Sequence, residues 1–155
     1  MNTMSKSSLF LILSILWSTN LLAQTSEQEV KVVIETLFDG MRAGDSSMVA
    51  STFSRDAIMQ TIASNQAGEV MKREGSLSQF LTSVGTPHDQ VWDERIGGYD
   101  IKIDGDLATA WTPYQFYEGD NFSHCGVNSF NLAKMKGEWK IIYIVDTRRR
   151  TNCVE

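Results

Sequence analysis

The first half of the chain has the hydrophobic period of amphipathic helices. Between residues 26 and 42, apolar side chains recur every three or four positions, and Ser26 with Glu29 forms a capping box. This pattern predicts a helix that begins at Ser26 and ends before Gly44. Four shorter elements are expected before residue 90, namely a helix at 45–53, a strand pair at about 58–62 and 69–72, and a helix at 76–84.

The second half alternates between apolar and polar residues, which is the period of strands. Turn residues divide it into four expected strands at about 91–103, 106–118, 122–136 and 138–149. Gly97 and Gly98 predict a bulge or bend in the first of them. Three consecutive hairpins give a long meander. The pattern therefore predicts one α+β domain in which N-terminal helices lie on one face of a curved antiparallel sheet.

The turn lengths predict which side chains share a face of this sheet. A two-residue turn at 136–137 places Phe130 opposite Tyr143. A three-residue loop after Glu118 pairs that residue with Phe122. The denser apolar face should meet the helices, and its larger and partly polar residues should form a ligand pocket. The expected pocket residues are Tyr99, Tyr114, Phe116, His124, Asn128, Phe130 and Tyr143.

The opposite face of the sheet should also carry apolar side chains in its middle. An aromatic and three aliphatic residues on a face otherwise open to water indicate a partner surface. We expect a homodimer that packs through Trp111, Val127, Ile142 and Ile144. The alternative is that these are scattered exposed apolar residues, which are common on proteins.

Residues 1–24 have the pattern of a secretory signal peptide. One charge, Lys6, precedes the apolar run 9–17, and a polar stretch follows. An uncleaved membrane anchor is the alternative, but the run is shorter than the ~20 residues that span a bilayer. We therefore expect a mature domain at 25–155, located in the periplasm or outside the cell and not in a membrane.

The two cysteines have two interpretations in such a compartment. Cys125 and Cys153 are the only pair, and an oxidising environment permits a disulfide. Alternatively, Cys125 could be a nucleophilic thiolate beside His124, although adjacent strand residues point to opposite faces.

Composition excludes several function classes. The formal net charge is −5, with 14 Lys+Arg against 19 Asp+Glu, which argues against a nucleic-acid-binding surface. The common dinucleotide, P-loop, zinc-protease and serine-hydrolase motifs are absent. Two cysteines without CxxC spacing and two histidines without HxxxH spacing predict no metal site, and we expect no cofactor.

Four short segments resemble a known superfamily. AGD (residues 43–45) and KGEWKI (136–141) are similar to the nuclear transport factor 2-like superfamily, which includes ketosteroid isomerase, scytalone dehydratase and SnoaL-type polyketide cyclases. HCGVNSF (124–130) and DTRR (146–149) resemble a secreted bacterial branch. The resemblance implies a cystatin-like fold with a cone-shaped cavity between the first helix and the sheet.

The resemblance also suggests roles for residues. The isomerase pattern needs an Asp base opposite a Tyr, but the sequence does not place Asp39 or Asp93 in the cavity. The dehydratase pattern of His and Tyr is best matched by His124 and Tyr114, which we take as the candidate catalytic residues. His124 could move a proton while Tyr114 polarises a carbonyl. Alternatively, His124 is a strand-end residue bonded to backbone or water.

Two function classes remain open at this stage. In the first, the domain binds a small apolar or aromatic molecule and acts as a cofactor-independent isomerase, dehydratase or cyclase. In the second, it is a non-catalytic interaction or dimerisation module. Asn128 on the inner face is either a ligand contact or a member of a buried hydrogen-bond network.

Overall fold

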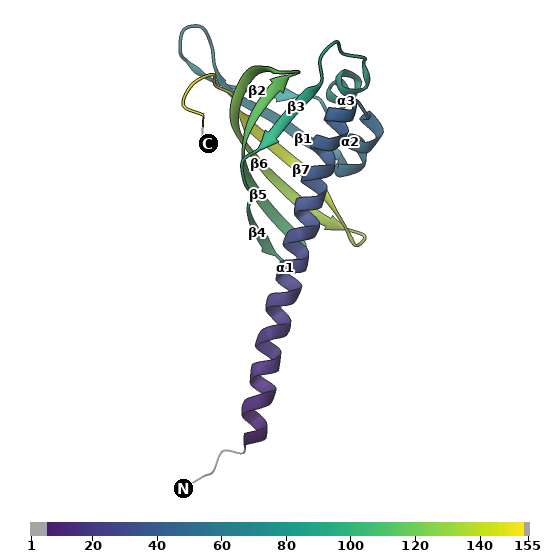
Figure 1. Ribbon diagram of the computed structural model, residues 1–155, viewed down its shortest axis with the longest axis vertical. Coiled ribbons are helices and arrows are strands. Elements are labelled where there is room, and N and C mark those ends of the chain that lie inside the picture. Colours follow the sequence, from purple (N-terminus) through teal and green to yellow (C-terminus); the bar gives the residue numbers. More distant parts are fainter. Residues whose placement is uncertain (1–5, 154–155) are drawn as a thin grey trace.

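The computed structural model describes the backbone of residues 6–153 and the side chains of residues 25–153 (Figure 1). Its helices are α1 (Lys6–Ala43), α2 (Ser46–Thr52) and α3 (Leu77–Gly85). Its strands are β1 (Phe53–Ser64), β2 (Val70–Gly75), β3 (Trp92–Ile96), β4 (Asp100–Asp104), β5 (Leu107–Glu118), β6 (Asn121–Met135) and β7 (Glu138–Thr147). The expected α+β class and the helices before the long strands are confirmed.

The helix ends follow the caps in the sequence, with one exception. The Asp45 carboxylate accepts hydrogen bonds from two backbone amides at the start of α2, and the Ser76 hydroxyl accepts one at the start of α3. The predicted cap at Ser26 is wrong, because α1 begins at Lys6 and no glycine or proline interrupts the sequence between them. The side chains of the predicted signal peptide, residues 1–24, lie outside the described part.

The strands form one curved sheet in the order β2-β1-β7-β6-β5-β3, with β4 also paired to β5 (Figure 1). The expected meander from β4 to β7 is present. The expectation of a wholly antiparallel sheet is wrong, since β1 runs parallel to β7. Parallel neighbours need a long crossover connection, and here the chain between β1 and β7 supplies it. This pairing brings the end of β7 beside β1, at the wall of the cavity described below.

The β5–β6 register agrees with the predicted inner face, although the turn is shorter than expected. Glu118 pairs with Asn121 instead of Phe122, and a bulge after Phe116 restores the predicted alignment of Phe116 with His124. The two changes cancel. The inward positions of both strands therefore remain as predicted.

The β6–β7 register departs from the prediction in its second half. The turn pairs Met135 with Glu138 as expected, but an irregularity between Asn131 and Leu132 shifts the alignment, so Phe130 lies opposite Ile144 instead of Tyr143. One extra residue in a strand turns every later side chain of that strand to the opposite face of the sheet.

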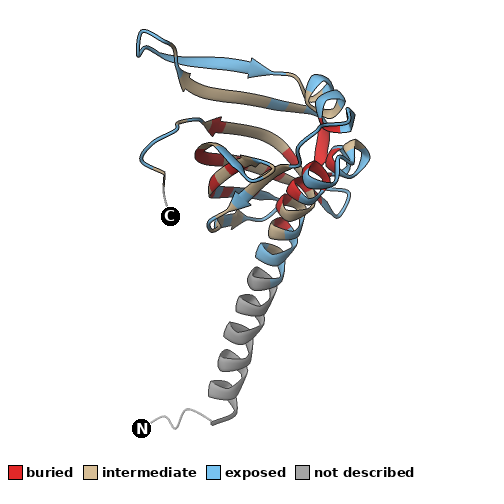
Figure 2. Cartoon of the chain, turned by 45° about the horizontal axis from the view of Figure 1, so that its top comes forward, coloured by how far each residue is buried: buried red, intermediate tan, exposed pale blue. Residues whose placement is uncertain are grey.

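The core lies between α1 and the concave face of the sheet (Figure 2). Val30, Ile34 and Leu37 of α1 are at most 1% exposed and belong to one apolar cluster with Phe130 and other inward residues of the sheet. The small side chains of Ala108 and Ala110 sit in this cluster and leave room for the helix, as predicted. Among the residues whose side chains are described, no helix is long and apolar enough to span a bilayer.

Candidate functional site

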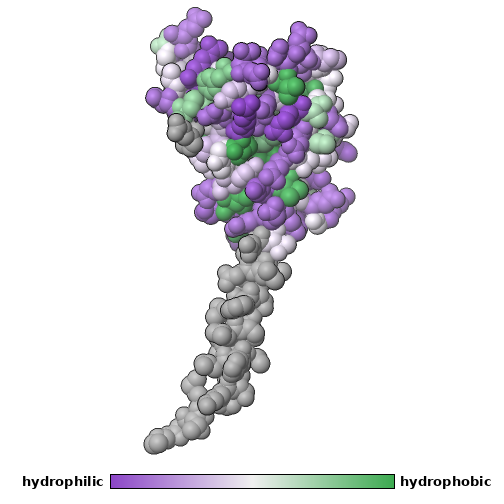
Figure 3. Space-filling view, in the orientation of Figure 1, coloured by the Kyte–Doolittle hydropathy of each residue, from purple (hydrophilic) through white to green (hydrophobic). Residues whose placement is uncertain are grey.

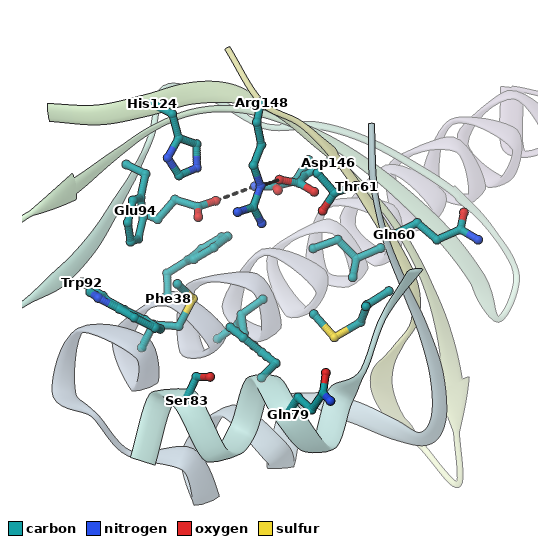
Figure 4. Close-up of a pocket in the computed structure, with 18 of the residues that line it drawn as sticks. Phe38, Gln60, Thr61, Gln79, Ser83, Trp92, Glu94, His124, Asp146 and Arg148 are labelled. Carbon is teal, nitrogen blue, oxygen red and sulfur yellow. Dashed lines mark hydrogen bonds and ion pairs between the residues drawn. The ribbon is translucent and has the colours of Figure 1, made fainter. Parts of the chain in front are cut away.

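A cavity of about 560 Å³ lies between α1, α3 and the sheet (Figure 4). Its apolar wall includes Leu37, Phe38, Met41, Phe53, Met59, Phe80, Trp92, Phe116 and Ile144. Within this wall, the rings of Trp92 and Phe116 meet edge to face with centroids 6.2 Å apart. A volume of several hundred cubic ångströms with aromatic walls suits a small organic molecule.

Charged and polar side chains gather at the sheet side of this cavity. Glu94 comes from β3, Asn128 from β6 and Asp146 from the end of β7, and Arg148 follows β7 (Figure 4). Asn128 and Asp146 are paired neighbours on β6 and β7, which explains why their side chains project to the same side. Three strands and the segment after β7 thus supply one polar cluster.

Asn128 donates a hydrogen bond from Nδ2 to Glu94 Oε1 at 2.7 Å. Asn128 is only 3% exposed, so it requires such a partner. The predicted alignment of Phe130 with Tyr143 would have put Asn128 opposite Val145, but the irregular register puts it opposite Asp146. Asn128 is therefore a member of a buried network and also lines the cavity.

Asp146 links Arg148 to Tyr114. Arg148 Nε donates to Asp146 Oδ2 at 2.6 Å, while Tyr114 Oη lies 3.2 Å from the same oxygen and 2.9 Å from the carbonyl oxygen of Thr147. Asp146 is 7% exposed and Tyr114 is 2% exposed. The Tyr114 hydroxyl thus donates to groups at the end of β7, and Tyr114 does not line the cavity.

Burial raises the pKa of the Glu94 carboxyl to about 7. The hydrogen bond from Asn128 favours the ionised form, but it does not outweigh the loss of water around the carboxylate. The negative charge of Asp146 raises the pKa further, and the positive charge of Arg148 lowers it. Glu94 can therefore both accept and return a proton near neutral pH, which is the property of a general acid–base group.

His124 also lines the cavity and packs against aromatic rings. Its ring centroid lies 5.0 Å from that of Phe116 and 5.7 Å from that of Tyr114, and Nδ1 is 3.2 Å from Ser123 Oγ. Partial burial, followed by the charge of Arg148, lowers the pKa of His124 below its usual value. The imidazole is therefore mainly neutral at pH 7.

The chain end after β7 is fixed against β6. Cys125 forms a disulfide with Cys153, and the backbones of Cys125 and Arg149 exchange two hydrogen bonds of 2.9 Å. This bond leaves no free thiol for a nucleophilic Cys125. Gly126 is required here, because a Cβ at this position would lie 1.7 Å from the Thr147 carbonyl oxygen.

The seven residues predicted to form the pocket are separated by the structure into three groups. Phe116, His124 and Asn128 line the cavity. Tyr114 and Phe130 are buried behind its wall, and Tyr99 is half-buried against the core, with Lys31 Nζ 5.0 Å from its ring centroid. The placement of Tyr143 on the inner face is wrong, because the irregularity in the β6–β7 register turns it outward, where its hydroxyl donates to Gln60.

The same irregularity divides the predicted dimer face. Trp111 is on the outer face and 53% exposed, and Ile142 is half-buried at the irregularity. Val127 is only 8% exposed, and Ile144 lines the cavity, so its assignment to the outer face is wrong. In the view of Figure 3, hydrophobic residues are separated by hydrophilic ones.

Glu94, Asp146 and Arg148 line the cavity but were not predicted from the sequence as cavity residues. Glu94 lies in the strand that was expected at 91–103, where its alternation with Trp92 could have placed both on one face. Asp146 was missed because its inward position depends on the β7 irregularity. Within the described residues, no three His, Cys, Asp or Glu side chains converge as metal ligands would.

Solved structures define the class to which this architecture belongs. A nuclear transport factor 2-like protein with a cystatin-like fold from Novosphingobium aromaticivorans aligns with a TM-score of 0.70 and 11% identity, over 88% of this chain and 90% of that chain. A nuclear transport factor 2-like protein of unknown function from Pseudomonas putida aligns with a TM-score of 0.61 and 19% identity, over 80% and 87%. The fold is thus nuclear transport factor 2-like, as the sequence motifs indicated.

A match to a family model identifies the family within this superfamily to which the chain belongs. The model of the family described as "Putative lumazine-binding" matches residues 25–145, and the chain belongs to this family. It is a ligand-binding family within the nuclear transport factor 2-like superfamily. No curated protein sequence matches the chain.

Proposed function

We propose that this protein binds a small apolar or aromatic carbonyl compound in the cavity between α1, α3 and the sheet, and that Glu94 exchanges a proton with it. The observation that carries this proposal is the position of the Glu94 carboxyl, which accepts a hydrogen bond from Asn128 and lies in an aromatic-walled cavity of about 560 Å³. Burial there raises its pKa to about 7. Perturbed acids in such cavities are frequently functional. The reaction class is a cofactor-independent isomerisation, dehydration or cyclisation.

The proton transfer needs no group beyond those of the cavity. The Glu94 carboxylate accepts a proton from the carbon next to the carbonyl, and the C–H electron pair forms the carbon–carbon double bond of an enolate. The carbonyl π electrons move to oxygen at the same time. Return of the proton from Glu94 to the same carbon regenerates the ketone, which gives hydrogen exchange, whereas its return to another carbon of a conjugated enolate completes an isomerisation. Asn128 keeps the carboxyl oriented through its 2.7 Å hydrogen bond.

Exchange of carbon-bound hydrogen with solvent tests this function without knowledge of the natural product. The protein is incubated with 2-tetralone in D₂O, and loss of the proton signal beside the carbonyl is followed by NMR. We expect catalysed exchange that Glu94→Gln reduces by about 100-fold, since the amide cannot accept the proton. Binding of the ketone should change by less than tenfold, because glutamine keeps the shape of the side chain.

Glu27→Gln is the matched control, because Glu27 is exposed on α1 and lies outside the cavity. It should exchange 2-tetralone at the wild-type rate. Equal rates in wild type and Glu94→Gln would contradict the role of Glu94.

His124→Ala tests whether the second titratable group of the cavity also carries the proton. A loss of exchange with unchanged affinity for 2-tetralone would indicate a proton shuttle at His124. Retained exchange would leave Glu94 as the only proton carrier.

We further propose that the protein acts in the periplasm or outside the cell as the mature domain 25–155. The signal-peptide pattern of residues 1–24 supports this location. The Cys125–Cys153 disulfide supports it independently, because such bonds persist in oxidising compartments. Mass spectrometry of the protein from the native host should find an N-terminus near residue 25, and an intact N-terminus would contradict cleavage.

A second candidate function is self-association through the outer face of the sheet. One observation favours it, namely the exposure of 53% of Trp111 in the middle of β5. Large aromatic side chains at such positions are typical of the centre of a protein interface. This function is compatible with ligand binding, because the cavity opens on the other side of the sheet.

A further inference from the structure

We propose that Arg148 binds the oxygen of the ligand that carries or develops negative charge, so that the ligand is an enolisable ketone or an acidic phenol. This inference rests on the proposed function, because it assigns the polar end of a ligand in the same cavity. It adds a charge-binding residue beside the proton acceptor Glu94 and predicts a preference among ligands of nearly equal shape.

The guanidinium of Arg148 is only partly used by the protein. Its Nε donates to Asp146 at 2.6 Å. Among the described residues, none accepts a hydrogen bond from its two terminal nitrogens, and 53% of the side chain is exposed. Figure 4 shows this group projecting into the cavity beside Glu94. An arginine with free donors in an aromatic-walled cavity is suited to an oxyanion.

Several contacts hold the guanidinium in this position. Asp146 fixes Nε, and Tyr114 in turn holds Asp146 through its hydroxyl. The backbone of Arg148 donates to the Ile62 carbonyl at 3.2 Å, at the end of the parallel β1–β7 pair. The next residue, Arg149, pairs with Cys125 of the disulfide. The site is therefore built before a ligand arrives, which lowers the cost of binding.

The charges around Arg148 agree with a developing anion. Asp146 from β7 balances the charge of Arg148, Tyr114 from β5 is neutral, and burial keeps His124 from β6 mainly neutral. Glu94 from β3 is the ionised group that loses its charge when it accepts a proton, and Glu118 lies at the exposed end of β5. Proton transfer then moves one negative charge from Glu94 to the ligand oxygen beside Arg148.

Two probes of nearly equal shape test this inference. 4-Nitrophenol can become an anion, and only its phenolate form is yellow, whereas 4-nitroanisole cannot ionise. Affinity for each, and the absorbance of bound 4-nitrophenol between pH 6 and 9, are measured for wild type and Arg148→Gln. We expect bound 4-nitrophenol to ionise about one pH unit lower in wild type than in Arg148→Gln, with about tenfold weaker phenolate binding in the variant. Affinity for 4-nitroanisole should be the same in both.

Two further variants guard against misinterpretation. The double variant Asp146→Asn/Arg148→Gln removes both charges, so no unpaired buried carboxylate is left, and it should show the same loss. Arg73→Gln removes a positive charge from exposed β2 and should behave as wild type. If both probes bind but phenolate binding is independent of Arg148, the inference is wrong and the proposed function stands. If neither probe binds but 2-tetralone does, the inference is wrong and the proposed function stands; if 2-tetralone also fails to bind, the proposed function fails as well.

Discussion

At the scale of single residues, Glu94 differs from the other carboxyl groups of the described residues whose pKa is shifted, because its pKa is raised while theirs are lowered. Its carboxyl has a pKa of about 7, against 4.5 for an ordinary glutamate. The folded protein therefore binds a proton on Glu94 in a pH range where the unfolded chain has released it. This difference links the site to the stability of the whole domain.

The sign of this linkage gives a prediction. Because the folded-state pKa is raised, the contribution of Glu94 to the free energy of unfolding falls as pH rises from about 4.5 to about 7 and stays low above that range. Glu94→Gln removes this dependence, so the variant should gain about 1–3 kcal/mol relative to wild type between pH 4 and pH 8. Urea unfolding at a series of pH values measures it.

The comparison with wild type isolates Glu94 from other titrating groups. His124 acts in the opposite direction, because its lowered pKa makes stability fall as the pH drops below 6.5. This contribution is common to wild type and Glu94→Gln and cancels in the difference. A difference between the two proteins that is constant from pH 4 to pH 8 would contradict the raised pKa.

The sequence placed side chains on the correct face of the sheet where the predicted strand alignment holds. Phe116, His124 and Asn128 are on β5 and β6, where the predicted alignment holds, and all three line the cavity. Asp146 and Tyr143 lie beyond the irregularity in β7. Strict alternation of side chains along the strand therefore assigned them to the wrong faces of the sheet. The raised pKa of Glu94 depends on tertiary burial, which no local pattern contains.

At the scale of elements, the segment after β7 has a structure that strand periodicity did not predict. Strand periodicity predicted β7 to extend to about residue 149, but the strand ends at Thr147. Beyond it, the Cys125–Cys153 bond and the Cys125–Arg149 backbone pair hold the chain against β6. The element that carries Arg148 is therefore fixed by a covalent link and not by propensity.

Removal of this link should destabilise the protein. The disulfide joins residues 28 positions apart, and closing a loop of this length in the unfolded chain is worth roughly 3 kcal/mol. Cys125→Ala/Cys153→Ala should therefore lose about 2–4 kcal/mol of unfolding free energy. Urea unfolding of the double variant beside reduced and oxidised wild type measures this loss. An unchanged midpoint would show that the backbone contacts alone hold the segment.

The helices and hairpins were more predictable because their signals are local. Asp45 and Ser76 cap α2 and α3 as expected, and the turn at 136–137 has the two positive φ angles of a tight hairpin. The parallel β1–β7 pair was not foreseen, because nothing within β1 specifies a partner more than 80 residues away.

At the scale of the whole molecule, the curved sheet has a covered face and an open one. The concave face meets α1 and encloses the cavity, so its residues have both structural and functional roles. The outer face leaves Trp111 exposed. Of the four residues expected to form a dimer face, Ile144 lies in the cavity and Val127 is buried. Trp111 is therefore the main remaining side chain that could contact a second copy of the chain.

Self-association can be tested at this anchor. We expect wild type to have the mass of a dimer and Trp111→Lys that of a folded monomer, because a charge at the centre of an apolar interface is not tolerated. Val91→Lys is the matched control, since Val91 has the same 53% exposure and precedes β3. Light scattering after gel filtration gives the masses, and a dimer mass for Trp111→Lys would reject this surface.

The central claim is that Glu94 is a proton-exchanging group inside a ligand cavity. Its most direct test is a ¹³C NMR titration of the Glu94 side-chain carboxyl, assigned by comparison with Glu94→Gln, without and with 2-tetralone. The account predicts that the free carboxyl titrates near pH 7 and that its apparent pKa and chemical shift change when the ketone is added. Titration near 4.5, with no response to the ketone, would contradict it.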